Sequence, residues 1–178
     1  MENASPPRHR LLTVPSSLVL VLCLFLPATQ GCDGPIYPLT MPFTWPPHLL
    51  GAVALGCTLG ARRSRGLALA IGLAASVSAA WFMLWIDAAA LVGLPLSLAA
   101  AAWLAIGALI WWHELGTCGP LPTAAIARRR RPLQVLVPVL AALMFATFAA
   151  IVARVPITMT PEPPIEPTFD GNLFGGGC

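Results

Sequence analysis

Hydrophobic residues fall into long runs along the chain, separated by short clusters of arginine. The longest run, Gly66 to Trp112, carries one formal charge, Asp87. A bilayer core about 30 Å thick takes about 20 apolar residues in a helix, so this run fits two crossings and is too long for one. The best division is at Val92–Pro95, because proline favours the first turn of a helix and glycine the end of the preceding one. We predict helices over about 66–91 and 95–115, with Asp87 in the last turn of the first.

Two further runs complete a predicted four-helix membrane domain over 48–154. The run over about 46–61 is short for a span, and its glycines weaken it as a free-standing helix. The run over 132–153 contains Pro138, which should kink it. The predicted fold class is therefore all-α, an integral membrane helical bundle. Short connections favour an up-and-down arrangement with antiparallel neighbours.

Small and aromatic residues within the long run predict how its helices pack. Four small residues spaced four apart form a stripe that should face another helix: Ala68, Gly72, Ser76 and Ala80. Tryptophan pairs near both ends of the predicted helical hairpin are typical of interfacial anchors: Trp81 with Trp85, and Trp111 with Trp112.

The first 31 residues form a separate signal-like segment or N-terminal anchor. Arg8 and Arg10 precede about ten apolar residues, Ser17–Leu26, which suit a signal-peptide core better than a full span. The stretch Leu26–Cys32 then resembles the lipobox of bacterial lipoproteins. That resemblance implies acylation of the Cys32 thiol and removal of residues 1–31. The alternative is an uncleaved anchor with an incidental cysteine.

Proline-rich segments flank the membrane domain. Residues 32–47 hold five prolines, which should block helices and sheet ladders and leave an extended extracytoplasmic loop. Residues 155–178 should form a disordered extracytoplasmic tail, because they cannot bury enough apolar surface to fold alone. Cys32 and Cys178 would then lie on the same side, where a disulfide between them would compete with lipidation of Cys32.

Composition supports a membrane protein and excludes a water-exposed domain. The 178 residues are 57% hydrophobic and 10% charged, whereas soluble domains carry about 25% charged residues. The net charge of +3 does not indicate nucleic-acid binding, because the basic residues cluster beside apolar runs. A cytoplasmic N-terminus places nine of the ten arginines inside: Arg8, Arg10, Arg62, Arg63, Arg65 and Arg128–Arg131. We therefore expect a multi-pass protein of the cell (inner) membrane with its C-terminal tail outside.

Candidate chemistry is sparse. Asp87 and His48 are the candidate ionisable membrane site, because both should lie at the outer face, although nothing in the sequence places them together. Arg128, Arg129, Arg130 and Arg131 form a lipid-facing basic cluster suited to anionic headgroups. His113-Glu114 begins like the zinc-protease motif His-Glu-x-x-His, but Thr117 stands in place of the second histidine. We interpret that pair as a polar helix end.

These observations favour a structural or accessory subunit, or a scaffold, in the membrane. The alternative is a small oligomeric channel or transporter subunit that uses Asp87. We expect no enzymatic activity, no cofactor and no metal site. The expected partners are the lipid bilayer and other membrane proteins or a second copy of the chain, and no nucleic acid.

Overall fold

The computed structural model describes residues 7–60, 64–86, 89–116 and 123–158, with the backbone alone described over 123–131. Over these residues the chain is mostly helical. The α-helices are α1 (Arg10–Leu22), α2 (Trp45–Leu59), α3 (Arg65–Trp85), α4 (Gly93–Gly116) and α5 (Thr123–Arg154). The shorter elements are η1 (Cys23–Phe25), β1 (Thr29–Gly31), β2 (Gly34–Ile36), η2 (Pro38–Thr40) and η3 (Pro42–Thr44).

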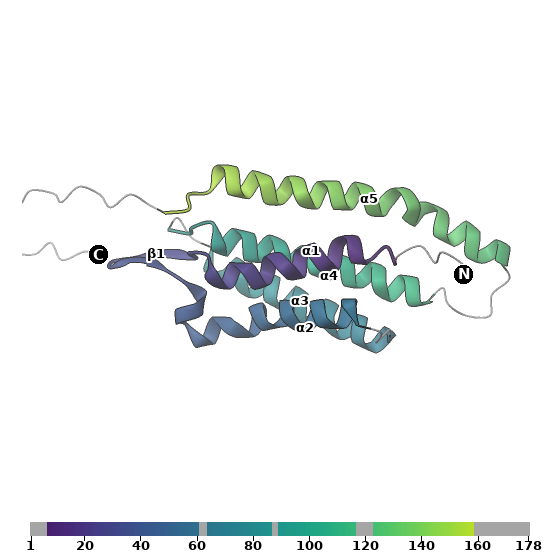
Figure 1. Ribbon diagram of the computed structural model, residues 1–178, viewed down its shortest axis with the longest axis horizontal. Helices are drawn as coiled ribbons and strands as arrows, with labels where there is room; N and C mark the ends of the chain where they lie inside the picture. The colour runs from purple at the N-terminus through teal and green to yellow at the C-terminus, as the bar shows by residue number, and fades with distance from the viewer. Residues whose placement is uncertain (1–6, 61–63, 87–88, 117–122, 159–178) are drawn as a thin grey trace, which may run out of the picture.

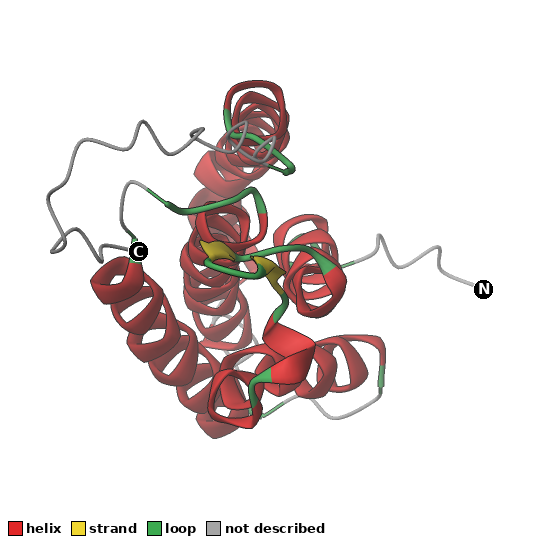
Figure 2. Cartoon of the chain, turned by 90° about the vertical axis from the view of Figure 1, so that its left-hand side faces the viewer, coloured by secondary structure: helices red, strands yellow, loops and turns green. Residues whose placement is uncertain are grey.

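The helices form an elongated bundle in which successive helices run in opposite directions (Figure 1). α5 lies along one side, α1 and α4 lie in the middle, and α2 and α3 lie along the other side. The strands β1 and β2 form a hairpin that projects from one end of this bundle, which faces the viewer in Figure 2. We call that end of the bundle the hairpin end. The other end, where α1 begins, is called the opposite end.

Among the described residues, three helices are long and apolar enough to cross a membrane: α3, α4 and the Pro132–Arg154 part of α5. This agrees with a multi-pass membrane protein. α1 and α2 have 13 and 15 residues. A helix of 15 residues is about 22 Å long at 1.5 Å per residue, which is less than the apolar thickness of a bilayer. The expected fourth span over 46–61 is therefore present as a helix, and its crossing of the membrane remains a prediction.

The helix predicted over 66–91 ends early, so its predicted C-terminal end is wrong. α3 stops at Trp85, Ile86 is already extended, and Ala90 forms an antiparallel bridge with Thr29. Backbone pairing explains the difference. Gln30 donates its N–H to the Ala89 carbonyl (3.1 Å), and Leu91 donates to the Ala28 carbonyl (2.9 Å). The backbone groups of residues 89–91 thus form hydrogen bonds with the segment around β1 instead of continuing the helix.

The proline-rich stretch 32–47 is more ordered than the extended loop predicted from it. It contains β2, η2, η3 and the start of α2. β2 pairs with β1 in antiparallel register, with Pro35 opposite Gln30. Proline is tolerated there because β2 is an edge strand, where a missing N–H breaks no ladder. Gly34 has φ 128°, a conformation that suits glycine at the end of the two-residue Cys32-Asp33 turn.

α5 begins at Thr123, nine residues before the predicted start of the last run at residue 132, so that predicted start is wrong. Alanine and arginine, which dominate this stretch, are both strong helix formers. Pro132 and Pro138 lie inside the helix, which is not straight in Figure 1. A helix interior proline removes one backbone bond and bends the helix without ending it.

α1 lies in the core of the bundle, in contact with α2, α4 and α5. Its fully buried residues include Leu12, Thr13, Ser16, Ser17 and Leu20, and three of these five are polar. Glycines on the neighbouring helices allow this close approach. A Cβ on Gly107 would lie 2.8 Å from Thr13 Cγ2, and one on Gly51 would lie 2.9 Å from the Ser17 carbonyl oxygen. The N-terminal segment is therefore packed as a bundle helix.

α3 and α4 form the packed helical hairpin expected from the long apolar run. The predicted small-residue stripe is only half correct. Ala68 is buried, but Ser76 and Ala80 are exposed. The buried side of α3 is formed by Ala68, Ile71, Ala75, Ser78 and Phe82.

Candidate functional site

Polar and aromatic side chains gather at the opposite end of the bundle, where α1 begins and α4 ends. His9 Nδ1 lies 2.7 Å from Glu114 Oε2, and the His9 ring stacks on Trp111 with centroids 5.0 Å apart. The Arg65 guanidinium lies over the Trp112 ring at 4.9 Å. His9 and Trp111 are 4% and 1% exposed. This cluster joins α1, α3 and α4, and we interpret it as a structural clasp.

Sequence reasoning missed this clasp. Glu114 was interpreted as an isolated polar helix end, and Trp111 as an interfacial anchor. Trp111 is instead a core residue, while Trp112 is 37% exposed. The pairing joins residues 105 positions apart, and the one available signal was a histidine just before the first apolar run.

A cavity of about 250 Å³ lies at the hairpin end, enclosed by elements that are far apart in the sequence. The hairpin, η2 and η3 cover it, and α2, α3 and α4 provide its walls. Most of its lining is apolar or aromatic: Ala28, Thr29, Ile36, Pro38, Met41, Phe43, Thr44, His48, Trp81, Phe82, Trp85, Leu94 and Ser97. None of these residues carries a permanent charge.

His48 is the unusual member of this lining. It is 2% exposed, and neither ring nitrogen has a hydrogen-bond partner among the residues that the structure describes. Its ring meets the Phe82 ring edge to face, with centroids 5.5 Å apart. The sequence predicted an outer-face histidine, and burial of this kind was not foreseen. Burying an imidazole without a partner is unfavourable, and burying its charged form is more so, which favours the neutral ring.

The hydroxyl groups around His48 already donate elsewhere. Ser97 donates to the Gly93 carbonyl at 2.7 Å, one turn earlier in α4. Thr44 lies close to two carbonyl oxygens, those of Met41 (2.7 Å) and Pro38 (2.9 Å). These hydroxyls can accept a hydrogen bond but have no further proton to offer.

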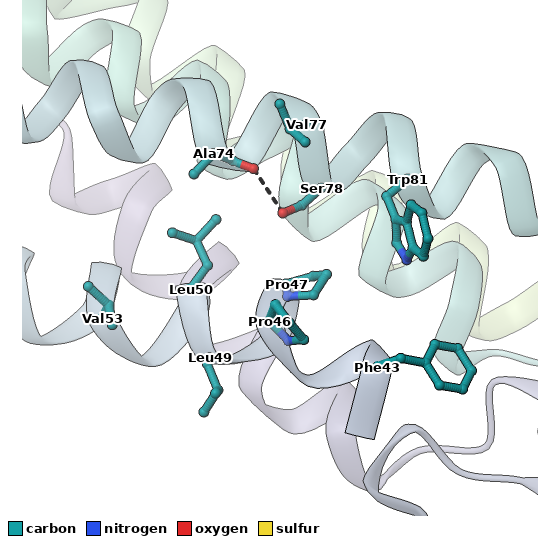
Figure 3. A pocket seen from close by; sticks show the side chains of 10 residues that line it. All are labelled: Phe43, Pro46, Pro47, Leu49, Leu50, Val53, Ala74, Val77, Ser78 and Trp81. Atoms are coloured by element: carbon teal, nitrogen blue, oxygen red, sulfur yellow. Dashed lines mark hydrogen bonds between the residues drawn. The ribbon is translucent and has the colours of Figure 1, made fainter. Parts of the chain in front are cut away.

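A second, open pocket of about 630 Å³ runs between α2 and α3 (Figure 3). Its walls are apolar: Phe43, Pro46, Pro47, Leu49, Leu50, Val53, Ala74, Val77, Ser78 and Trp81. The Ser78 hydroxyl is satisfied by the Ala74 carbonyl at 2.8 Å. Phe43 and Trp81 line both this groove and the His48 cavity, so the two spaces adjoin.

Most of the other predicted site residues lie outside the part of the chain that the structure describes. Cys32 is an exposed free thiol in the turn between β1 and β2. Its predicted disulfide partner Cys178 lies outside the described residues, as does Asp87. The side chains of Arg128–Arg131 are also outside the described part. Lipidation, the disulfide and the basic cluster remain predictions.

Within the described ranges, no group of three or more histidine, cysteine or acidic side chains could hold a metal ion. The mostly apolar linings make the cavity and the groove a candidate binding site of apolar character. Comparisons with protein-family models, curated proteins and solved structures found no match for the chain.

Proposed function

We propose that the chain is a structural or accessory subunit of a membrane assembly, which it joins through the outward face of α5. The supporting observation is a row of alanines on that helix. One side of α5 packs against the bundle through Leu133, Val137, Met144 and Phe148. At 100° per residue, the opposite side carries Ala142, Ala146, Ala149, Ala150 and Ala153, all exposed.

Small residues matter on such a face because lipid tails are as apolar as leucine. Helices associate in a bilayer where small side chains allow backbones to approach closely. A face meant only for lipid gains nothing from alanine at every turn between residues 142 and 153, whereas earlier in the span the same side carries the exposed Val135 and Val139. The alanine face (Ala142, Ala146, Ala149, Ala150 and Ala153) therefore supports contact with a helix of a second copy or of another membrane protein.

A photo-crosslinking residue at Ala146 tests this proposal in intact membranes. We expect it to form a protein adduct, whereas the same residue at Ala80, an exposed alanine of α3, should label mainly lipid. Ala150→Leu should lower the Ala146 adduct several-fold, because a leucine at this position keeps the backbones apart. Equal protein adducts at the two positions, or none at Ala146, would contradict the proposal.

The alternative is a small oligomeric channel or transporter subunit that uses Asp87. The buried hydroxyls of Ser78 and Ser97 donate to carbonyls of their own helices. An ion or proton path needs ionisable groups that face the bundle interior. The alternative continues to depend on Asp87, outside the described residues.

The packing also supports retention of residues 1–31 as an anchor. Cleavage before Cys32 would cut the chain in the turn between β1 and β2 and detach α1 from the core. Arg10 and Arg65 begin helices at the opposite end of the bundle, and Arg154 ends α5 at the hairpin end. By the positive-inside rule, this supports an orientation with the opposite end in the cytoplasm.

A further inference from the structure

His48 is almost fully buried in the cavity wall, yet neither of its ring nitrogens has a hydrogen-bond partner among the described residues. A neutral imidazole offers one donor and one acceptor. Buried polar groups are normally satisfied, so such a pair in a cavity wall indicates a missing hydrogen-bonding group.

Water alone is a poor candidate for that group. An ordered water in a protein interior makes about three hydrogen bonds to polar groups. The cavity offers His48 and hydroxyls that already donate to backbone carbonyls, and aromatic side chains form much of the rest. A space of about 250 Å³ is also far larger than one or two waters require.

The adjoining groove indicates what the rest of the occupant is. It continues from the cavity past Phe43 and Trp81, is open on one side, and is lined by aliphatic side chains. Neither lining includes an arginine, aspartate or glutamate. A charged headgroup would be desolvated there without a partner, which is costly. The occupant should therefore be uncharged, polar at one end and apolar along its length.

We propose that the cavity and groove together bind a neutral single-chain lipid. Its one hydroxyl or carbonyl oxygen hydrogen-bonds His48, and its apolar chain lies along the groove between α2 and α3. A bilayer phospholipid can place a tail in the groove, but its charged headgroup does not fit beside His48. The site is thus selective for an uncharged head. This proposal does not depend on whether another helix contacts α5.

The test uses the full-length protein in phospholipid nanodiscs and a long-chain primary alcohol with a photoreactive diazirine in its chain. The matched probes are a fatty acid and an alkane with the same chain and diazirine. We expect the alcohol to label groove residues such as Val53 and Val77, and unlabelled alcohol to compete. The fatty acid and the alkane should label these residues about tenfold less. This is the affinity ratio expected when one good hydrogen bond to the protein is lost.

Two pairs of variants separate the site from general stability. His48→Phe keeps an aromatic ring without polar atoms and should lower alcohol labelling about tenfold, while His48→Gln should retain most of it. Thr58→Val is the matched control, because Thr58 is a buried polar residue of the same helix that lines neither space. Ala74→Phe should block the groove, and Ala80→Phe, on another face of α3, should not.

Several results would overturn the proposal. Equal labelling of wild type and His48→Phe would remove the role of the histidine. Equal labelling by the alcohol and the fatty acid would remove selectivity for a neutral head. Adducts spread over all exposed faces of the bundle would show ordinary solvation by lipid. If His48→Phe fails to fold, the Ala74→Phe comparison and the probe series on wild type still decide.

Discussion

A chain that begins at Cys32 is expected to lose the folded bundle. The truncation removes α1, whose fully buried side chains lie between α2, α4 and α5. It also removes β1, whose backbone bonds hold residues 89–91. The loss should exceed about 5 kcal/mol, which is the lower end of the unfolding free energy of native proteins. The measurement is monodispersity on size-exclusion chromatography and the thermal unfolding midpoint in mild detergent.

The matched control for this truncation is a chain that begins at Pro7. It keeps His9, whose ring contacts Trp111 and Glu114, and it keeps all of α1. Its unfolding midpoint should equal that of the full-length chain within a few degrees. A Cys32 chain that is as monodisperse and as stable as the Pro7 chain would show that α1 is not part of the core.

Gly107→Val is expected to lower the free energy of unfolding by about 1–3 kcal/mol, the usual cost of overpacking a core. At Gly107, α4 meets α1 with no room for a side chain. An added Cβ would lie 2.8 Å from Thr13 Cγ2 and 3.2 Å from the Thr13 backbone nitrogen. The methyl of Thr13 can shift slightly, but the backbone of α1 cannot move without loosening its contacts with α2.

Gly56→Val provides the control, because a Cβ at Gly56 meets nothing within 4 Å. Both changes replace glycine by valine inside a helix, so they share the same modest gain in helix propensity. The difference between the two unfolding midpoints therefore isolates the α1–α4 contact. Equal midpoints would mean that the two helices do not approach as closely as the structure places them.

The membrane character of the chain and the division of its long apolar run could be predicted because both follow from local physics. Helix length against bilayer thickness requires two helices between Gly66 and Trp112, and Gly93-Leu94-Pro95 marks where the second begins. α4 starts at Gly93, two residues before the predicted position. Hydropathy and proline placement can be read from short stretches of sequence, so predictions based on them require no knowledge of the fold.

The end of α3 could not be predicted in the same way. It depends on backbone pairing between residues about 60 positions apart, Thr29 with Ala90. No local pattern encodes that pairing. The second half of the predicted stripe on α3, Ser76 and Ala80, is exposed for a related reason. Small residues at a four-residue spacing mark a close approach only if a helix lies on that side, and the buried side of α3 passes through Ala75 and Phe82 instead.

The candidate site illustrates the same limit. His48 could be identified as the polar residue of a short apolar helix, but its burial depends on η2 and η3 folding over it. Those turns come from the prolines that the sequence had suggested would give only a loop. The clasp between His9 and Glu114 likewise depends on α1 lying beside α4, a property of the complete bundle.

The central claim is that α1 is a permanent core helix, and intact mass tests it most directly. The full-length chain would be purified from the membrane of a bacterial host that processes lipoproteins. The expected result is the mass of a chain that retains residues 1–31, with an unmodified Cys32. A chain that begins at Cys32 and carries acyl groups would contradict the claim and would establish the lipoprotein alternative.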